Sequence, residues 1–122
     1  MKLVRRADVG PFDFDGLEIR DLTATLAESS ASVAHIEVSP GIEHQKARST
    51  LSDKYYICLH GEIQFLVDGE PADLAAGDLL IVERGDWFSY GNPGPEPAHL
   101  LLVHVPPFDL EYEEFAGEPD AP

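Results

Sequence analysis

The chain has 122 residues, the length of one domain, and 43% of them are hydrophobic, as in a globular protein. Its formal net charge of -15 argues against nucleic acid and anionic membrane surfaces as partners, since both attract cations. No apolar run is long enough for a membrane span, and no signal-peptide core follows the first residues. A cytoplasmic, soluble protein is therefore expected, and the single cysteine, Cys58, fits a reducing compartment.

Short segments that end at turn residues predict an all-β chain. Residues 1–16 form a leading arm in which Leu3 and Val4 could make a short strand. The main strand candidates alternate apolar with polar residues or are short apolar runs, namely 17–22, 32–38, 54–60, 62–68, 79–83, 87–91 and 98–105. No segment has a helical period, so an antiparallel sandwich or barrel is expected over residues 17–108. The acidic tail, 109–122, has no packing signal and is expected to be partly disordered.

Residues 40–61 carry an unusual density of polar side chains between two expected strands. The stretch opens with the turn residues Pro40 and Gly41 and closes at Gly61. Its polar members are Glu43, His44, Lys46, Arg48, Ser49, Thr50 and Lys54. Alternation along 54–60 places two sets on opposite faces: Lys54, Tyr56, Cys58 and His60 on one, and Tyr55, Ile57 and Leu59 on the other.

Two glycine-framed motifs of this chain resemble those of the cupin superfamily. The family motif G-x5-H-x-H-x(3,4)-E-x6-G matches the spacing from Gly41 to Gly61, and G-x5-P-x-G-x2-H-x3-N matches that from Gly77 to Asn92. The resemblance covers roughly residues 17–108 and implies a jelly-roll β-barrel, whose tight strand reversals call for glycine. Cupins of this size are commonly homodimers, so a homodimer is also implied, and the mass of the particle in solution would test it.

The positions that bind a divalent ion in typical cupins hold other residue types in this chain, namely Ala47, Ser49, Lys54 and Phe88. Alanine and phenylalanine have no donor atom, serine is a poor ligand, and an ammonium repels a cation. No metal and no other cofactor is therefore expected. One route to a metal stays open, in which displaced histidines serve as ligands: His44 with His60, His99 or His104.

The resemblance also implies a cavity where the ion would lie. Lys54 and Tyr56 are the candidate catalytic residues, because a lysine among apolar side chains has a lowered pKa and can act as a base or nucleophile. The candidate ligand-binding residues are His44, Arg48, Ser49, Gln64, Phe88 and Tyr90. The alternative is a structural role, in which Lys54 pairs with an acidic neighbour such as Glu43 or Asp53.

Three functions remain open on these observations. The first is a metal-independent cupin that binds a small polar or aromatic molecule and assists proton transfer through Lys54, as an isomerase or lyase would. Small cupins similar to this chain are often compared with sugar-phosphate isomerases, which is an analogy of fold. The second is a non-catalytic dimeric binding or sensing module. The third is a metal-dependent oxygenase or isomerase that uses the displaced histidines.

Overall fold

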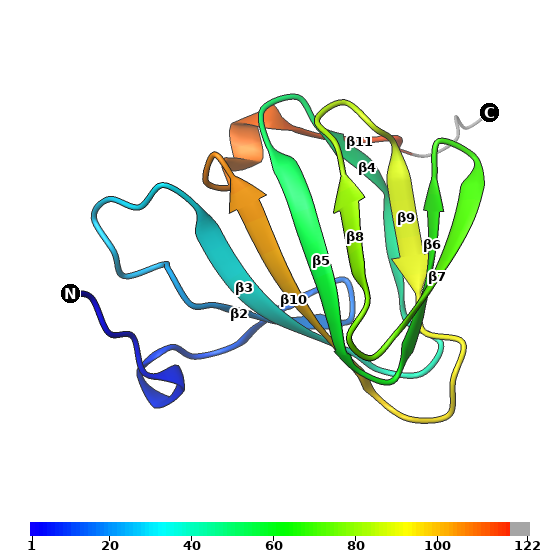
Figure 1. The fold of residues 1–122 in the computed structure, drawn as a ribbon, viewed down its shortest axis with the longest axis horizontal. Helices are drawn as coiled ribbons and strands as arrows, with labels where there is room; N and C mark the ends of the chain where they lie inside the picture. The colour runs from blue at the N-terminus through cyan, green and yellow to red at the C-terminus, as the bar shows by residue number, and fades with distance from the viewer. Residues whose placement is uncertain (118–122) are drawn as a thin grey trace.

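The computed structural model describes residues 1–117, which form eleven strands and two short 3-10 helices. The elements are η1 (Arg6–Asp8), β1 (Phe12–Phe14), β2 (Leu17–Asp21), β3 (Ser32–Val38), β4 (Glu43–Ser49), β5 (Asp53–His60), β6 (Glu62–Val67), β7 (Glu70–Ala75), β8 (Leu79–Val82), β9 (Phe88–Gly91), β10 (Ala98–Val105), η2 (Leu110–Tyr112) and β11 (Glu113–Phe115). They build a six-stranded sheet, β1-β2-β3-β10-β5-β8, and a five-stranded sheet, β11-β4-β9-β6-β7. The two antiparallel sheets curve toward each other as a barrel (Figure 1), which confirms the predicted fold class.

The strand predictions from apolar patterning agree with the structure to within one or two residues. Strands β3 and β10 have the predicted bounds, because both alternate regularly and both end before proline or a Pro-Gly turn. Strand β4 was missed, since its sequence, EHQKARS, contains no apolar run. Only Ala47 and Ser49 of β4 are buried, and both are small. The polar stretch is therefore itself a strand, paired with β9 and β11.

Both ends of the chain contribute more to the fold than the sequence predicts. In the arm, β1 pairs with β2, whereas Leu3 and Val4 form no strand. In the tail, the Asp109 side chain caps η2, and β11 then pairs with β4. Residues 109–117, for which the sequence carries no packing signal, are thus packed against the fold, and the partial disorder expected of the tail stays a prediction for residues 118–122, which lie outside the described part of the chain. Three residues with two glutamates give no strand signal, so β11 could not be foreseen.

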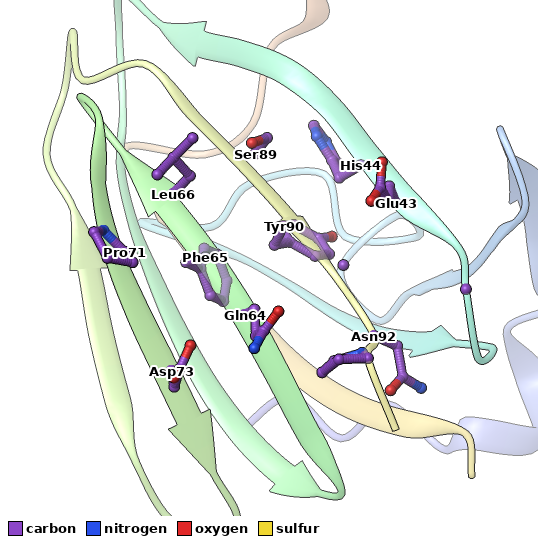
Figure 2. A pocket seen from close by; sticks show the side chains of 13 residues that line it. Glu43, His44, Gln64, Phe65, Leu66, Pro71, Asp73, Ser89, Tyr90 and Asn92 are labelled. Atoms are coloured by element: carbon purple, nitrogen blue, oxygen red, sulfur yellow. The ribbon is translucent and has the colours of Figure 1, made fainter. Parts of the chain in front are cut away.

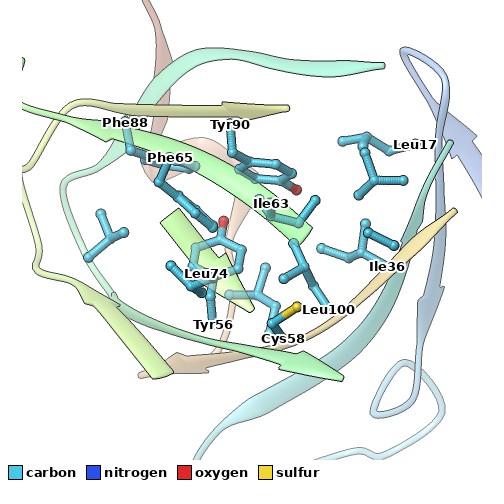
Figure 3. Packing of buried hydrophobic residues seen from close by; sticks show 14 of the residues in the cluster. Leu17, Ile36, Tyr56, Cys58, Ile63, Phe65, Leu74, Phe88, Tyr90 and Leu100 are labelled. Atoms are coloured by element: carbon cyan, nitrogen blue, oxygen red, sulfur yellow. The ribbon is translucent and has the colours of Figure 1, made fainter. Parts of the chain in front are cut away.

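The hydrophobic core lies between the sheets, and Figure 3 shows much of it from close by. Aromatic rings form much of it: the ring centroids of Tyr56 and Phe65 are 4.9 Å apart, and those of Phe65 and Tyr90 are 4.8 Å apart. Lys54, Tyr56 and Cys58 are all buried, which confirms the alternation predicted for β5. The core residues Ile36, Tyr56, Tyr90 and Leu102 also line a cavity, so the cavity adjoins the core.

The outer face of the six-stranded sheet differs from the prediction at one residue. A register shift in the β5–β10 ladder sets His60 opposite His99, with ring centroids 5.9 Å apart. The His60 side chain is 62% exposed and so does not join Lys54 inside the barrel.

Exposed apolar side chains, Leu79 and Ile81, lie on the edge strand β8. That the chain forms a homodimer, as its resemblance to small cupins implies, stays a prediction. Within residues 1–117, no helix has the length and apolar character needed to cross a membrane.

Candidate functional site

A cavity of about 270 Å³ adjoins the hydrophobic core and shares lining residues with it. Its walls come from both sheets and from the two ends of the chain. The apolar lining residues are Phe12, Phe14, Ile19, Val33, Ala34, Ile36, Leu102, Phe108, Leu110 and Phe115. The polar lining side chains include His44, Lys54, Tyr56, Tyr90, His104 and Glu113. The cavity therefore combines an apolar wall with a small set of polar groups, as ligand sites in proteins do.

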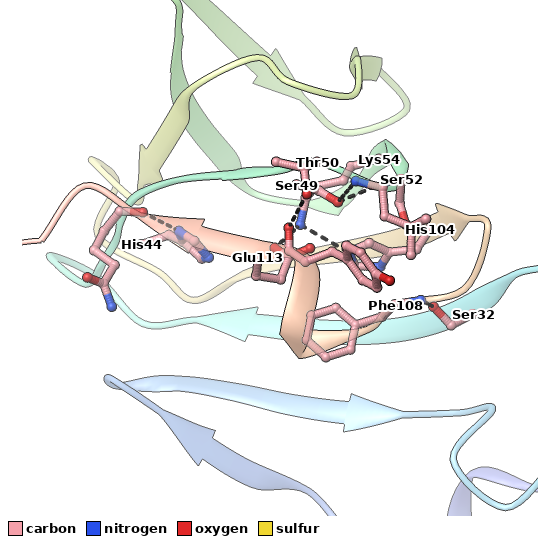
Figure 4. A network of polar contacts seen from close by, with 12 residues as sticks. Ser32, His44, Ser49, Thr50, Ser52, Lys54, His104, Phe108 and Glu113 are labelled. Atoms are coloured by element: carbon pink, nitrogen blue, oxygen red, sulfur yellow. Dashed lines mark hydrogen bonds and ion pairs between the residues drawn. The ribbon is translucent and has the colours of Figure 1, made fainter.

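A buried ion pair forms one part of the polar lining (Figure 4). The Lys54 ammonium donates to Glu113 Oε1 at 2.7 Å and to His104 Nε2 at 3.0 Å. The Lys54 and Glu113 side chains are each 5% exposed. Burial lowers the pKa of Lys54, and the Glu113 carboxylate opposes this by favouring the charged form. Burial, together with the Lys54 charge, also lowers the pKa of His104 to about 3, so this imidazole is a neutral acceptor at pH 7.

His44 supplies a neutral imidazole beside this pair. Its ring lies 5.0 Å from that of Tyr90, 5.1 Å from that of Phe88 and 6.1 Å from that of Phe14. Nδ1 lies 2.6 Å from the Gln45 carbonyl oxygen, and because a carbonyl only accepts, Nδ1 carries the hydrogen. Nε2 is then the nitrogen with a free lone pair. Burial lowers the pKa of His44 to about 4, so the ring is neutral at pH 7.

Two tyrosines complete the polar lining and stay protonated. Burial raises the pKa of Tyr56 well above its usual value, with Tyr90 and Glu113 nearby adding to the shift, and burial also raises the pKa of Tyr90. Neither phenol is therefore a base at neutral pH. The Tyr90 hydroxyl and Glu113 Oε2 are buried and have no hydrogen-bond partner within residues 1–117.

The structure brings four of the predicted site residues together at the cavity: His44, Lys54, Tyr56 and Tyr90. Phe88 lies behind them in the core, with its ring 5.2 Å from Lys54 Nζ. The other three predicted residues lie elsewhere. Arg48 stacks on Trp87 at 4.7 Å and pairs with Glu114 at 2.8 Å, and both members of that pair are partly exposed. Its position on β4 therefore directs it away from the barrel interior.

Ser49 and Gln64 also lie outside the cavity lining. Ser49 Oγ accepts hydrogen bonds from the backbone N–H groups of Leu51 and Ser52, which fixes the turn after β4. Gln64 is exposed on β6 and borders a second groove, which shares His44 and Tyr90 with the cavity (Figure 2). The ligand-binding roles of these residues stay predictions without support from their positions.

Four of the eight polar cavity residues were not predicted as site residues from the sequence, namely Asp21, Ser32, His104 and Glu113. His104 carried a usable signal, because alternation along β10 places it on the same face as the buried Leu100 and Leu102. Glu113 carried none, since it is one of 23 acidic residues and lies in the tail. The expectation that Lys54 pairs with Glu43 or Asp53 names the wrong partner, because Asp53 Oδ1 accepts from the Arg84 backbone N–H at 2.8 Å instead.

The residues at the family's ligand positions do not fit a metal ion. Ala47 and Phe88 are buried without a donor atom, and the Lys54 ammonium occupies the space between His104 and Glu113. No group of three histidine, cysteine, aspartate or glutamate side chains in residues 1–117 is arranged to hold an ion. A cation there would displace the ammonium from both of its partners.

A barrel of two antiparallel sheets, with a cavity lined by residues of both, is the architecture of the jelly-roll barrel proteins. A family model described as "Cupin domain" matches residues 34–104, more than half of the chain. The chain therefore belongs to the cupin family, as the glycine-framed motifs predicted.

Two curated proteins are similar to this chain over most of its length. A Myxococcus xanthus protein named endoribonuclease YbeY is 32% identical over 110 residues, which are 88% of this chain and 37% of that protein. The tetracenomycin polyketide synthase protein TcmJ of Streptomyces glaucescens is 28% identical over 105 residues, which are 84% of this chain and 70% of that protein. The chain thus spans little more than a third of the first relative and about two thirds of the second.

Solved structures with the same fold include enzymes and ligand complexes. A variant of Streptomyces PAC13 with uridine matches at a TM-score of 0.82 and 19% identity, covering 95% of this chain and 91% of that one. PAC13 is described as a nucleoside dehydratase. A predicted oxalate decarboxylase from Thermotoga maritima matches at 0.77 and 22% identity, covering 85% of this chain and 98% of that one. At these identities the likeness shows the fold alone.

Proposed function

We propose that the barrel cavity binds an uncharged small molecule with a flat, largely apolar body and a hydroxyl or carbonyl group, without a metal. The observation that carries this proposal is the lining: apolar side chains form most of the wall, and the polar groups gather around Lys54, His44 and Tyr90. The volume of about 270 Å³ suits a molecule of one or two rings. A flat body would pack against aromatic side chains such as Phe14 and Phe115.

The charge of the site supports an uncharged ligand. The charges of Lys54 and Glu113 cancel, and His44 and His104 are neutral at pH 7 because their pKa values fall to about 4 and about 3. The other acidic side chain of the lining, Asp21, accepts a hydrogen bond from the Thr23 N–H at 3.1 Å. The chain as a whole carries a formal net charge of -15. A phosphate group would thus enter a negative field with no free cation to receive it, which argues against a sugar phosphate as the ligand.

Two ligand classes fit this description, and each has a similar protein to support it. PAC13, which shares the fold, is described with uridine, an uncharged nucleoside with a planar base. TcmJ, which is similar in sequence, is named as a polyketide synthase protein. An aromatic polyketide is also flat, and it is more apolar than a nucleoside, as the wall of this cavity requires.

Titration of the full chain with uridine and with 2-naphthol, followed by NMR in the presence of EDTA, tests the proposal. At least one of the two is expected to shift signals of the cavity-lining residues, among them Ile36 and Leu102. Uridine 5′-monophosphate and 2-naphthol-6-sulfonate should bind at least about tenfold more weakly than their uncharged parents, because the site offers no counter-charge. Tight binding of the charged forms, or shifts that vanish with EDTA and return with a divalent ion, would contradict the proposal.

We further propose that His44, rather than Lys54, accepts the proton if the bound molecule reacts. His44 has a free Nε2 lone pair and a neutral ring, whereas the Lys54 ammonium is held by Glu113 and His104. An ammonium has three N–H donors, so one remains to stabilise negative charge on a ligand oxygen. This arrangement suits proton abstraction next to a carbonyl, the first step of an isomerisation or elimination.

Hydrogen–deuterium exchange of 2-tetralone in D2O, followed by NMR, measures this step without knowledge of the natural substrate. The protein is expected to accelerate exchange at the carbon next to the carbonyl, and His44→Gln should lower the acceleration by about 100-fold or more while binding persists. His60→Gln is the matched control, because His60 is exposed outside the barrel. Unchanged exchange in His44→Gln with loss in Lys54→Met would make Lys54 the base. No acceleration in the wild type would favour a binding module.

A further inference from the structure

We propose that Glu113 determines ligand specificity: its second carboxylate oxygen selects molecules that present a hydrogen-bond donor inside the cavity. This inference rests on the proposed function, since it concerns what the same cavity accepts. It assigns the ligand class more narrowly, as flat uncharged molecules with a free hydroxyl or N–H group. It also gives a ligand-binding role to the C-terminal strand β11, which carries Glu113.

The observation behind this inference is an unused acceptor in a buried carboxylate. Glu113 is 5% exposed, and Oε1 accepts from the Lys54 ammonium at 2.7 Å. Oε2 is buried and has no partner within residues 1–117, although Glu113 lines the cavity. A buried acceptor without a hydrogen bond is destabilising, and the penalty is greater for a charged group. A ligand donor that reaches Oε2 would remove that penalty.

Tyr90 supplies an independent sign that a polar ligand group enters the same space. Its side chain is 3% exposed, and its hydroxyl has no hydrogen-bond partner in the described chain. A phenol can donate as well as accept, so Tyr90 tolerates either kind of ligand group. An ionised carboxylate only accepts, so Glu113 is the group that can discriminate a donor from an acceptor.

The backbone around Glu113 holds this acceptor in place before any ligand arrives. Glu113 lies opposite Ser49 in the β4–β11 pair, and the Tyr112 carbonyl accepts from the Thr50 N–H at 2.9 Å. The Asp109 side chain caps the turn of η2 that leads into β11. On the cavity side, Lys54 fixes Oε1. Because the carboxylate is held at both its backbone and one oxygen, the direction of Oε2 is set, which favours selective binding.

The wild-type protein alone can test the inference with two probes that differ by one donor, 2-naphthol and 2-methoxynaphthalene. The apolar ring system is the same, and only the hydroxyl can donate to Glu113. We expect 2-naphthol to bind at least about tenfold more tightly, because the methoxy compound leaves Oε2 unpaired. Equal affinities would overturn the role of Glu113 while leaving the cavity proposal intact. If neither probe binds in the cavity, this inference fails, and the proposed function fails with it only when uridine does not bind either.

Glu113→Gln sharpens the test, because the amide oxygen can still accept from Lys54 while the NH2 group replaces Oε2 by a donor. The preference for 2-naphthol is then expected to disappear or reverse in favour of the methoxy compound. Glu114→Gln, on the exposed side of the same strand, is the matched control and should keep the wild-type ratio. Tyr90→Phe should weaken both probes without changing their order. A wild-type preference that persists in Glu113→Gln would overturn the assignment.

Discussion

Replacing Glu113 by alanine is expected to destabilise the fold by about 3–5 kcal/mol, because it leaves the buried Lys54 ammonium without its counter-ion. The two side chains are each 5% exposed and their charged atoms are 2.7 Å apart. Burial already lowers the pKa of Lys54, and removal of the carboxylate takes away the main interaction that favours its charged form. Urea denaturation at pH 7 measures the change in the free energy of unfolding.

Glu114→Ala is the control for this prediction. Glu114 is the next residue on β11 and pairs with Arg48, but its side chain is 48% exposed, so the loss should stay within about 0.5 kcal/mol. The double variant Lys54→Met with Glu113→Leu should recover most of the stability lost in Glu113→Ala, since apolar residues can replace a buried ion pair. If Glu113→Ala and Glu114→Ala lower the free energy of unfolding by similar small amounts, the Lys54–Glu113 pair is not buried in solution.

The architecture could be read from the sequence because its signals are local or fixed in spacing. Most strands other than β4 and β11 show apolar patterning over a few residues, as Lys54, Tyr56 and Cys58 do, and the glycine frame from Gly41 to Gly61 places the turns. The inward direction of Phe88 and Tyr90 follows from the same rule and is confirmed by their burial. Half of the polar cavity lining could therefore be placed before any coordinates were known.

The half of the polar cavity lining that the sequence did not predict depends on contacts between distant parts of the chain. Glu113 meets Lys54 across 59 positions, and nothing in three residues of an acidic tail signals that pairing. His60 illustrates a second limit, because the register shift opposite His99 moves its side chain to the outer face, and alternation alone cannot foresee a bulge. The consequence for function is direct: without Glu113, Lys54 looks like a free base, and with Glu113 it is a paired ammonium beside a neutral His44.

Acidification is expected to weaken the fold steeply between pH 6.5 and about 4.5, because the half-buried His44 and the buried His104 are neutral in the folded state. Burial lowers the pKa of His44 to about 4 and that of His104 to about 3, against 6.5 for an unburied histidine. In this range the unfolded chain binds more protons than the folded one, so stability falls as pH falls. The stabilisation is complete above pH 6.5 and is lost by about 1.4 kcal/mol per pH unit for each histidine.

His104→Gln separates the contribution of one of these histidines from general acid unfolding. The glutamine carbonyl can still accept from the Lys54 ammonium, which now reaches His104 Nε2 at 3.0 Å, but it does not titrate. Urea denaturation at half-unit pH steps should therefore show a slope lower by about 1.4 kcal/mol per pH unit than in the wild type. His60→Gln, exposed on the outer face, should leave the slope unchanged. If the free energy of unfolding of His104→Gln changes with pH as steeply as that of the wild type, His104 is already protonated in the folded protein. Its Nε2 could not then accept the hydrogen bond from Lys54.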